Sequence, residues 1–152
     1  MAVVYEHTVE ITSNLDDVIE LDEVVFGEKK DKAEWLAKAG LTLYVIRSPE
    51  GQVVSYAAVY QDGDNKHVWK VGTRDDYKRR GCLKALVAAV RKVASDRDVT
   101  IGTEPARPLF AGMVGFLAAE EAAGRAERFD RGARAKAGYV YYRWPAPAGK
   151  TA

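Results

Sequence analysis

The fold of this chain is decided by the stretch Val71-Gly72-Thr73-Arg74-Asp75-Asp76-Tyr77-Lys78-Arg79-Arg80-Gly81-Cys82-Leu83-Lys84-Ala85-Leu86. An apolar strand ends here, a short basic loop follows, and a helix begins at the glycine. The first amides of a helix have no partner within the helix. Together with the positive end of the helix dipole, they form a site that suits phosphate. Lys78, Arg79 and Arg80 add three positive charges, so the stretch predicts a ligand that carries phosphate.

Length and composition indicate one domain with a hydrophobic core, because the chain has 152 residues and 47% of them are hydrophobic. The net charge of +1 points to no class of partner. The charges are unevenly distributed, however. Residues 6–28 are acidic and contain no Lys or Arg, whereas residues 70–98 are rich in both. Two interpretations stay open: a cation-binding and an anion-binding region, or two solvated surfaces of opposite sign.

The cellular compartment is predicted from what the sequence lacks. Cys82 is the only cysteine, which is typical of a protein in a reducing compartment. No apolar run approaches the roughly 20 residues of a membrane span, and no secretory signal is visible at the N-terminus. We therefore expect a cytoplasmic protein that contacts no membrane. The single domain is predicted over residues 1–144, followed by a disordered tail over residues 145–152.

Turn residues and hydrophobic periodicity divide the chain into strands and helices. A strand is expected over residues 3–11, and a helix follows that is capped by Ser13 or Asn14 and ended by Gly27. A short second helix is capped by Asp31 and ended by Gly40. Strands over 41–46, 53–60 and 67–73 form an antiparallel meander. Further elements are a helix from residue 83, a strand over 99–103 parallel to 67–73, a helix over 109–123, a strand and turn within 125–134, and a strand over 139–144.

This order of elements, together with the loop, resembles the GCN5-related N-acetyltransferase (GNAT) family over the chain up to Trp144. The family's loop reads Gln or Arg, two variable residues, Gly, one variable residue, then Gly or Ala. It aligns here with residues 78–83, where Lys78 and Leu83 depart from the pattern. Tyr77 matches an aromatic residue that often precedes the loop. The resemblance implies a mixed α/β fold, in which a mostly antiparallel central sheet is flanked by helices and splays between its fourth and fifth strands.

The resemblance also implies acetyl-CoA as co-substrate and a direct transfer of its acetyl group to an amine in a ternary complex. The residues that would bind the cofactor are Val71, Gly72 and Thr73 along the acyl arm, and Lys78, Arg79, Arg80, Gly81, Cys82, Leu83 and Lys84 around the pyrophosphate. A preorganised N–H donor to the thioester carbonyl is worth ~2.7–4 kcal/mol in acyl transfer. No metal site is predicted.

The general base is the first of two groups that the reaction needs. An alkylamine has a pKa near ~10.4, so a base must take its proton. The family often uses a Glu on the fourth strand, and this chain has none there. Glu104, at the end of the fifth strand, is the candidate base, and the alternative is a turn residue paired with Arg107. His67 is interpreted as a surface histidine next to a turn.

The general acid is the second group. The family's Tyr lies a few residues before a Gly-Phe pair, but Gly115-Phe116 aligns Ala111 with it and Gly138-Tyr139 aligns Arg134. Tyr139, or another tyrosine of the last strand, is the candidate acid, although strand aromatics also pack in cores. Cys82 lies at a helix start beside cations, which favours a reactive thiol. The family's apolar core residue at that position favours a buried, inert one.

The acceptor is expected against the first two helices, where acidic residues such as Glu20 and Glu23 favour a cationic amine. Such an acceptor would be a polyamine, an aminoglycoside-like compound, or an amine of a peptide or protein; a solvated acidic face is the alternative. Two rival functions stay open. One is a catalytically degenerate acyl-CoA-binding domain. The other is a nucleic-acid-binding or -modifying protein whose basic loop and helix follow a phosphate backbone. The sequence allows a homodimer.

Overall fold

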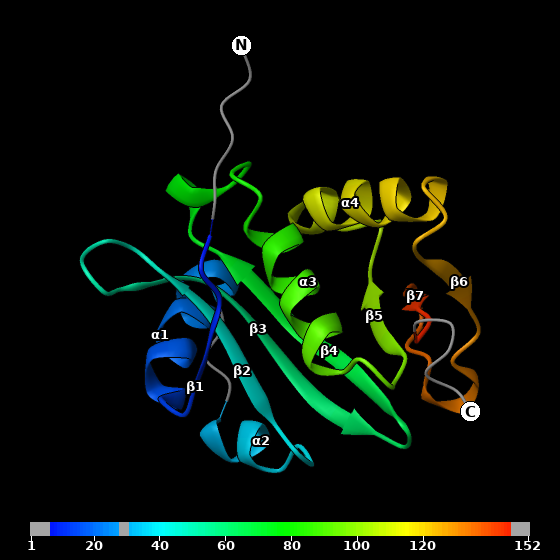
Figure 1. The fold of residues 1–152 in the computed structure, drawn as a ribbon, viewed down its shortest axis with the longest axis horizontal. Helices are drawn as coiled ribbons and strands as arrows, with labels where there is room; N and C mark the ends of the chain where they lie inside the picture. The colour runs from blue at the N-terminus through cyan, green and yellow to red at the C-terminus, as the bar shows by residue number, and fades with distance from the viewer. Residues whose placement is uncertain (1–6, 28–30, 147–152) are drawn as a thin grey trace.

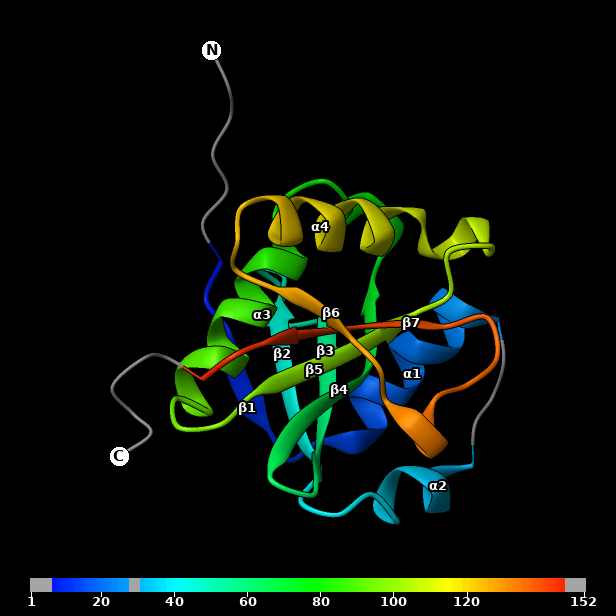
Figure 2. The ribbon, with the colours of Figure 1, turned by 90° about the vertical axis from the view of Figure 1, so that its right-hand side faces the viewer.

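The computed structural model describes residues 7–27 and 31–146, which form one seven-stranded sheet with helices on both faces (Figures 1 and 2). The strand order is β1-β2-β3-β4-β5-β7-β6. The strands are β1 (Glu10–Thr12), β2 (Thr42–Arg47), β3 (Val53–Asp62), β4 (Asn65–Thr73), β5 (Val99–Thr103), β6 (Glu127–Phe129) and β7 (Val140–Trp144). The helices are α1 (Leu15–Phe26), α2 (Lys32–Leu36), α3 (Cys82–Val93) and α4 (Ala111–Ala122), with 3-10 turns at Asp75–Tyr77, Pro108–Phe110 and Gly132–Arg134.

Each face of the sheet has its own hydrophobic core. α1 and α2 cover one face, where Val18 and Trp35 are fully buried. α3 and α4 cover the other, where Leu86 and Leu117 are fully buried. No helix in the described part of the chain is long and apolar enough to cross a membrane. The predicted mixed α/β fold is therefore confirmed, with its antiparallel meander β2-β3-β4 and the parallel pair β4 and β5.

Several predicted boundaries are wrong. The first strand covers only Glu10–Thr12 of the described residues, while residues 3–6 of the predicted strand lie outside them. α2 ends at Leu36, and Gly40 (φ 61°) belongs to the turn before β2. α4 begins at Ala111, because a 3-10 turn precedes it. At the predicted tail, the amide of Ala146 donates to Asp98 Oδ1 (2.7 Å), and residues 147–152 lie outside the described range.

A β-bulge causes the splay between β4 and β5. Ala58 of β3 pairs with Lys70 and the next residue pairs with Val68, so Trp69 is an extra residue in β4. Such a bulge bends the strand that carries it. The parallel pairing of β4 with β5 ends at the adjacent pair, Val68 with Ile101. Beyond this point the edge of β4 that faces β5 pairs with no strand among residues 7–27 and 31–146, which confirms the predicted separation of the two strands.

Glycines lie on both strands of the splay because tyrosine rings of neighbouring strands cover them. A Cβ atom at Gly72 would lie 2.6 Å from Cε1 of Tyr56, and one at Gly102 would overlap the ring of Tyr141. Glycine in a strand commonly marks such a close approach. The two rings lie on β3 and β7, next to the separated strands. The packing of the sheet thus accounts for both glycines.

Candidate active site

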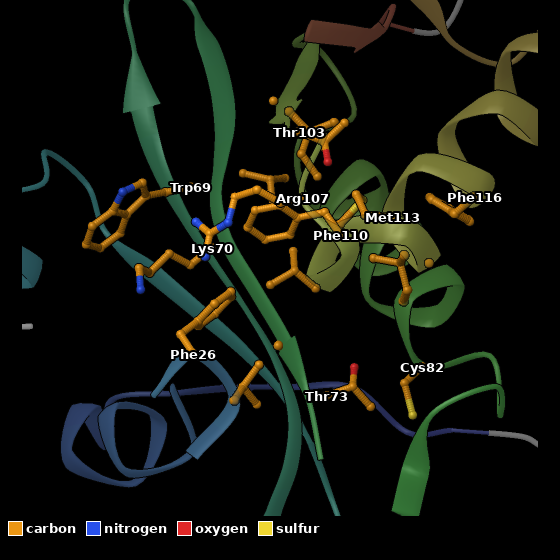
Figure 3. Close-up of a pocket in the computed structure, with 18 of the residues that line it drawn as sticks. Phe26, Trp69, Lys70, Thr73, Cys82, Thr103, Arg107, Phe110, Met113 and Phe116 are labelled. Carbon is orange, nitrogen blue, oxygen red and sulfur yellow. The ribbon is translucent and has the colours of Figure 1, made fainter. Parts of the chain in front are cut away.

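A cavity of about 770 Å³ lies between the separated ends of β4 and β5 (Figure 3). This volume is in the range of small-molecule and cofactor sites. It is bordered by Phe26 at the end of α1, Cys82 at the start of α3, Phe110 just before α4 and Met113 within α4 (Figure 3). The predicted cofactor-binding residues that line it are Val71, Gly72, Thr73, Lys78, Arg79, Gly81, Cys82, Leu83 and Lys84. Arg80 is not among the lining residues.

The loop before α3 presents unbonded amides to the cavity. Gly81 (φ 80°) and Arg79 (φ 62°) both adopt left-handed backbone conformations, which turn the chain into the helix. The amide of Ala85 donates to the carbonyl of Gly81 (3.0 Å). The four preceding amides, Gly81 to Lys84, donate no hydrogen bond to any residue in the described ranges. Such a run of N–H groups at a helix start is a site for an anion.

The cations of the loop differ in their surroundings. Lys78 pairs with Asp75 (3.0 Å) at the protein surface. The guanidinium of Arg80 lies over the ring of Tyr77, 4.7 Å from its centroid, in a cation–π contact. Arg79 and Lys84 both line the cavity. The structure therefore brings Arg79, Lys84 and the four amides to one end of the cavity, where they provide positive charge and hydrogen-bond donors.

Cys82 and Leu83 both contact the core behind this loop. Cys82 is buried, and its burial raises the pKa of the thiol although the charge of Arg80 opposes the shift. The predicted burial of Cys82 is therefore confirmed, and its raised pKa favours an unreactive thiol. Leu83 is half-buried and packs against the core beneath α3. Its side chain thus has a hydrophobic contact that turns it toward the protein interior, although it also borders the cavity.

The two candidate catalytic groups are neighbours, but only one lines the cavity. Glu104 is not a lining residue, and its Oε1 lies 3.9 Å from Nη1 of Arg107, as in the turn pairing that the sequence also allowed. Tyr139 lines the cavity and stacks on Tyr141, with 6.1 Å between ring centroids. The pKa of Tyr139 is raised, mainly by burial and further by the charge of Glu104. Its hydroxyl therefore stays protonated at neutral pH.

The predicted acidic acceptor wall does not line the cavity. Glu20 is exposed and Glu23 is half-buried, and neither is a lining residue. α1 contributes Val25 and Phe26 instead. Asp22, which shares the apolar face of the helix, is buried at 1% exposure.

Asp22 is the centre of a buried polar network that the sequence analysis missed. Its carboxylate accepts hydrogen bonds from the hydroxyl of Tyr56 and from Nζ of Lys70 (2.8 and 2.9 Å). The ammonium of Lys70 also lies 4.7 Å from the ring centroid of Phe26 (Figure 3). Lys70 and Phe26 both line the cavity, so this network fixes one of its walls. The sequence signal was an aspartate on the apolar stripe of an amphipathic helix.

His67 is not the surface histidine that the sequence suggested. It is 5% exposed and lines the cavity, and its Nδ1 lies 2.7 Å from Oγ1 of Thr100. Burial lowers its pKa to about 3, and the charges of Arg131, Lys38 and Lys136 act in the same direction. The original interpretation is wrong because β4 is an interior strand, and the rings of Tyr60 and Tyr141 pack beside the imidazole. The imidazole is neutral at physiological pH.

Thr103, at the end of β5, adds a hydroxyl to the same cavity. Its Oγ1 is buried and has no hydrogen-bond partner among the residues that the structure describes. Figure 3 shows the side chain at the β5 side of the cavity, opposite Lys70. Buried polar atoms without a partner are rare in native proteins. Thr103 therefore offers an unused donor and acceptor to a molecule in the cavity.

Comparison with known proteins shows which family this part of the chain resembles. A family model described as an acetyltransferase (GNAT) domain matches residues 30–101, which include β4, the loop, α3 and the first residues of β5. These residues are similar to a GNAT acetyltransferase domain. The resemblance expected from the loop is confirmed over the matched residues. No curated protein matches this sequence.

Solved structures support the fold. The ribosomal-protein-S18-alanine N-acetyltransferase of Escherichia coli superposes with a TM-score of 0.71 at 12% identity, covering 97% of this chain and 99% of that one. A GNAT-family acetyltransferase of Staphylococcus aureus gives 0.67 at 14% identity, with 92% and 100% covered. An IAA acetyltransferase of Bacillus cereus gives 0.68 at 11% identity, with 92% and 99% covered. At these identities, the likeness shows the GNAT fold alone.

Proposed function

We propose that this protein transfers the acetyl group of acetyl-CoA directly to the amine of a small acceptor, with both substrates bound in the cavity. One observation carries the proposal: a single cavity joins four unbonded amides at the start of α3 to the open edge of β4. Bound acetyl-CoA supplies an acetyl group already activated as a thioester. The transfer then needs positioning, a proton donor and a proton acceptor from the protein.

The loop and the strand edge supply the positioning. The amides of Gly81 to Lys84, with the charges of Arg79 and Lys84, suit a diphosphate. The free edge of β4 over Val71–Thr73 suits an extended acyl arm, because an unpaired strand edge offers N–H and C=O groups in a row. One cavity extends from the loop to the point where β4 and β5 separate. The acyl end of a cofactor bound at the loop would therefore reach that point.

Tyr139 is our choice for the proton donor. It lines the cavity, and its raised pKa keeps the hydroxyl protonated at neutral pH. It would give this proton to the departing sulfur. Glu104 acts on Tyr139 through its charge, and we assign to it the uptake of the amine's proton through water. The unpartnered hydroxyl of Thr103 is available to orient either substrate.

The experiment measures release of free thiol from acetyl-CoA with a panel of amines, together with calorimetry of coenzyme A binding. Lys84→Gln should raise the Kd of coenzyme A about tenfold or more, because a hydrogen bond to a charged group is worth ~1.5–3 kcal/mol. Tyr139→Phe should lower kcat about 100-fold without changing that Kd. Lys92→Gln, on an exposed position of the same helix, is the matched control. Absence of coenzyme A binding, or an unchanged Kd in Lys84→Gln, would overturn the proposal.

A further inference from the structure

Cations and aromatic rings line the end of the cavity where β4 begins, and their charge bears on which acceptor can bind there. Lys38, Arg131 and Lys136 all line it, with the rings of Tyr60 and Tyr141 between them. None of the described residues that line the cavity is an Asp or a Glu. The loop at α3 follows the other end of β4, so these cations are not needed for a diphosphate bound there.

Arg131 lies on the buried side of this cluster. Its side chain is 11% exposed, and its Nη2 donates to Asp62 (2.9 Å) and to the hydroxyl of Tyr60 (3.1 Å). Its Nε is buried and has no hydrogen-bond partner within the described ranges. The guanidinium also lies over the ring of Tyr141, 5.2 Å from the centroid. A rigid, buried guanidinium with an unused donor is suited to an anionic group.

The two lysines of the cluster contact aromatic rings in place of carboxylates. The ammonium of Lys38 lies 5.0 Å from the ring centroid of Tyr60 and 4.7 Å from that of Trp69. The ammonium of Lys136 lies 5.7 Å from the ring centroid of Tyr139. No ion pair to a described residue is found for either lysine. Within this cluster only Arg131 has a carboxylate partner, Asp62, which Arg134 shares.

The cluster therefore has an excess of positive charge in a partly enclosed space. His67, at its centre, does not offset this charge, since burial and the three cations keep the imidazole neutral with a pKa of about 3. Coulomb interactions are stronger here than in water because the effective dielectric constant is lower. A second cation would be repelled, and an anion would be attracted. A polyamine or an aminoglycoside-like acceptor does not fit these surroundings.

We propose that Lys38, Arg131 and Lys136 form an anion subsite, so that the acceptor is a small amine that also carries a carboxylate or phosphate group. This inference rests on the proposed acetyl transfer and replaces the cationic acceptor expected from Glu20 and Glu23. The rings of Tyr60, Trp69 and Tyr141 provide apolar surface beside the anion. The amine of such an acceptor lies in a positive potential, which lowers its pKa and favours the neutral, nucleophilic form.

Matched acceptors test the subsite through thiol release. Tyrosine is compared with tyrosinamide and tyramine, phosphoethanolamine with ethanolamine, and spermidine is added as a polycation. At least one acid-bearing acceptor should exceed its uncharged partner in kcat/KM by about tenfold or more, the effect of one hydrogen bond to a charged group. The tyrosine and phosphoethanolamine arms distinguish carboxylate from phosphate. Equal or higher kcat/KM for the amines that lack an acid group, or for spermidine, would overturn the inference and leave the proposed transfer standing.

Variants and a binding measurement separate the two proposals. Lys38→Gln and Lys136→Gln should each lower the preference for the acidic acceptor about tenfold, mainly through its KM, without changing the Kd of coenzyme A. Lys136 is exposed and Lys38 is half-buried, so the variants should fold, and Lys92→Gln is again the control. If no acceptor releases thiol, the proposed transfer fails. Calorimetry of N-acetyltyrosine against N-acetyltyrosinamide then decides the subsite: binding of the acid alone supports it, and binding of neither or of both equally overturns it.

Discussion

Replacing Asp62 with asparagine tests the buried ion pair that supports this cluster. Asp62 is 13% exposed at the end of β3, and it pairs with Arg131 (2.9 Å), which is 11% exposed, and with the more exposed Arg134. Asparagine keeps the shape of the side chain and removes its charge. The guanidinium of Arg131 would then lose its charged partner and keep its contacts with the hydroxyl of Tyr60 and the ring of Tyr141.

The expected loss of stability follows from this burial. Breaking a buried ion pair by removing one partner costs about 3–5 kcal/mol, because the other charge stays buried. Asparagine retains one acceptor oxygen, so we expect a value near the lower limit, about 3 kcal/mol. For a protein of this size, each kcal/mol shifts the Tm by roughly 2–4 °C. The variant should therefore melt about 6–12 °C below the wild type.

Urea unfolding and thermal unfolding, followed by circular dichroism, measure the effect. Asp16→Asn is the control, because its pair with Lys32 is exposed and should contribute at most about 1 kcal/mol. The double variant Asp62→Asn/Arg131→Met removes both charges and should recover much of the lost stability. A loss below about 1 kcal/mol in Asp62→Asn, or a double variant no more stable than the single one, would refute the reasoning.

Three further predictions concern single residues. The ring of His67 should not titrate by NMR between pH 5 and 8, since its pKa is about 3. The unfolded chain takes up a proton near pH 6.5, so stability from His67 should fall as the pH is lowered from about 6.5 toward 3, and His67→Gln should remove that part of the pH dependence. Cys82 should react slowly with a thiol reagent in native protein and at once in denaturant, because burial raises its pKa; fast native labelling would show the thiol is accessible. Gly72→Ala should cost about 1–3 kcal/mol, since the new methyl would lie 2.6 Å from the ring of Tyr56, whereas Gly115→Ala in α4, with open space, should stabilise by roughly 0.5–1 kcal/mol.

Local chemistry made much of the fold predictable. Gly27 and Gly81 adopt left-handed conformations at a helix end and a helix start, as their places between periodic segments indicated. Asn14 and Asp31 cap their helices through side-chain hydrogen bonds. The strand over residues 99–103 was predicted with its observed bounds, because a turn and a proline confine it. These signals lie within a few residues of the structure that they specify.

The acceptor end of the cavity could not be predicted in this way. Lys38, His67, Arg131 and Lys136 come from four separate parts of the chain, and only the sheet order brings them together. The bulge at Trp69 also has no local signal, because pairing with β3 defines it. Charge counting along the first helix favoured a cationic acceptor, yet helical periodicity turns its glutamates away from the cavity and buries Asp22.

The account depends most on the amides of Gly81 to Lys84 as the binding site for the diphosphate of coenzyme A. Titration of nitrogen-15-labelled protein with coenzyme A, and separately with pantetheine, tests this directly. Coenzyme A should cause its largest amide shift changes at residues 79–84, whereas pantetheine, which has no diphosphate, should affect Val71–Thr73 and leave the loop unchanged. Amides at residues 81–84 that do not respond to saturating coenzyme A would contradict the account.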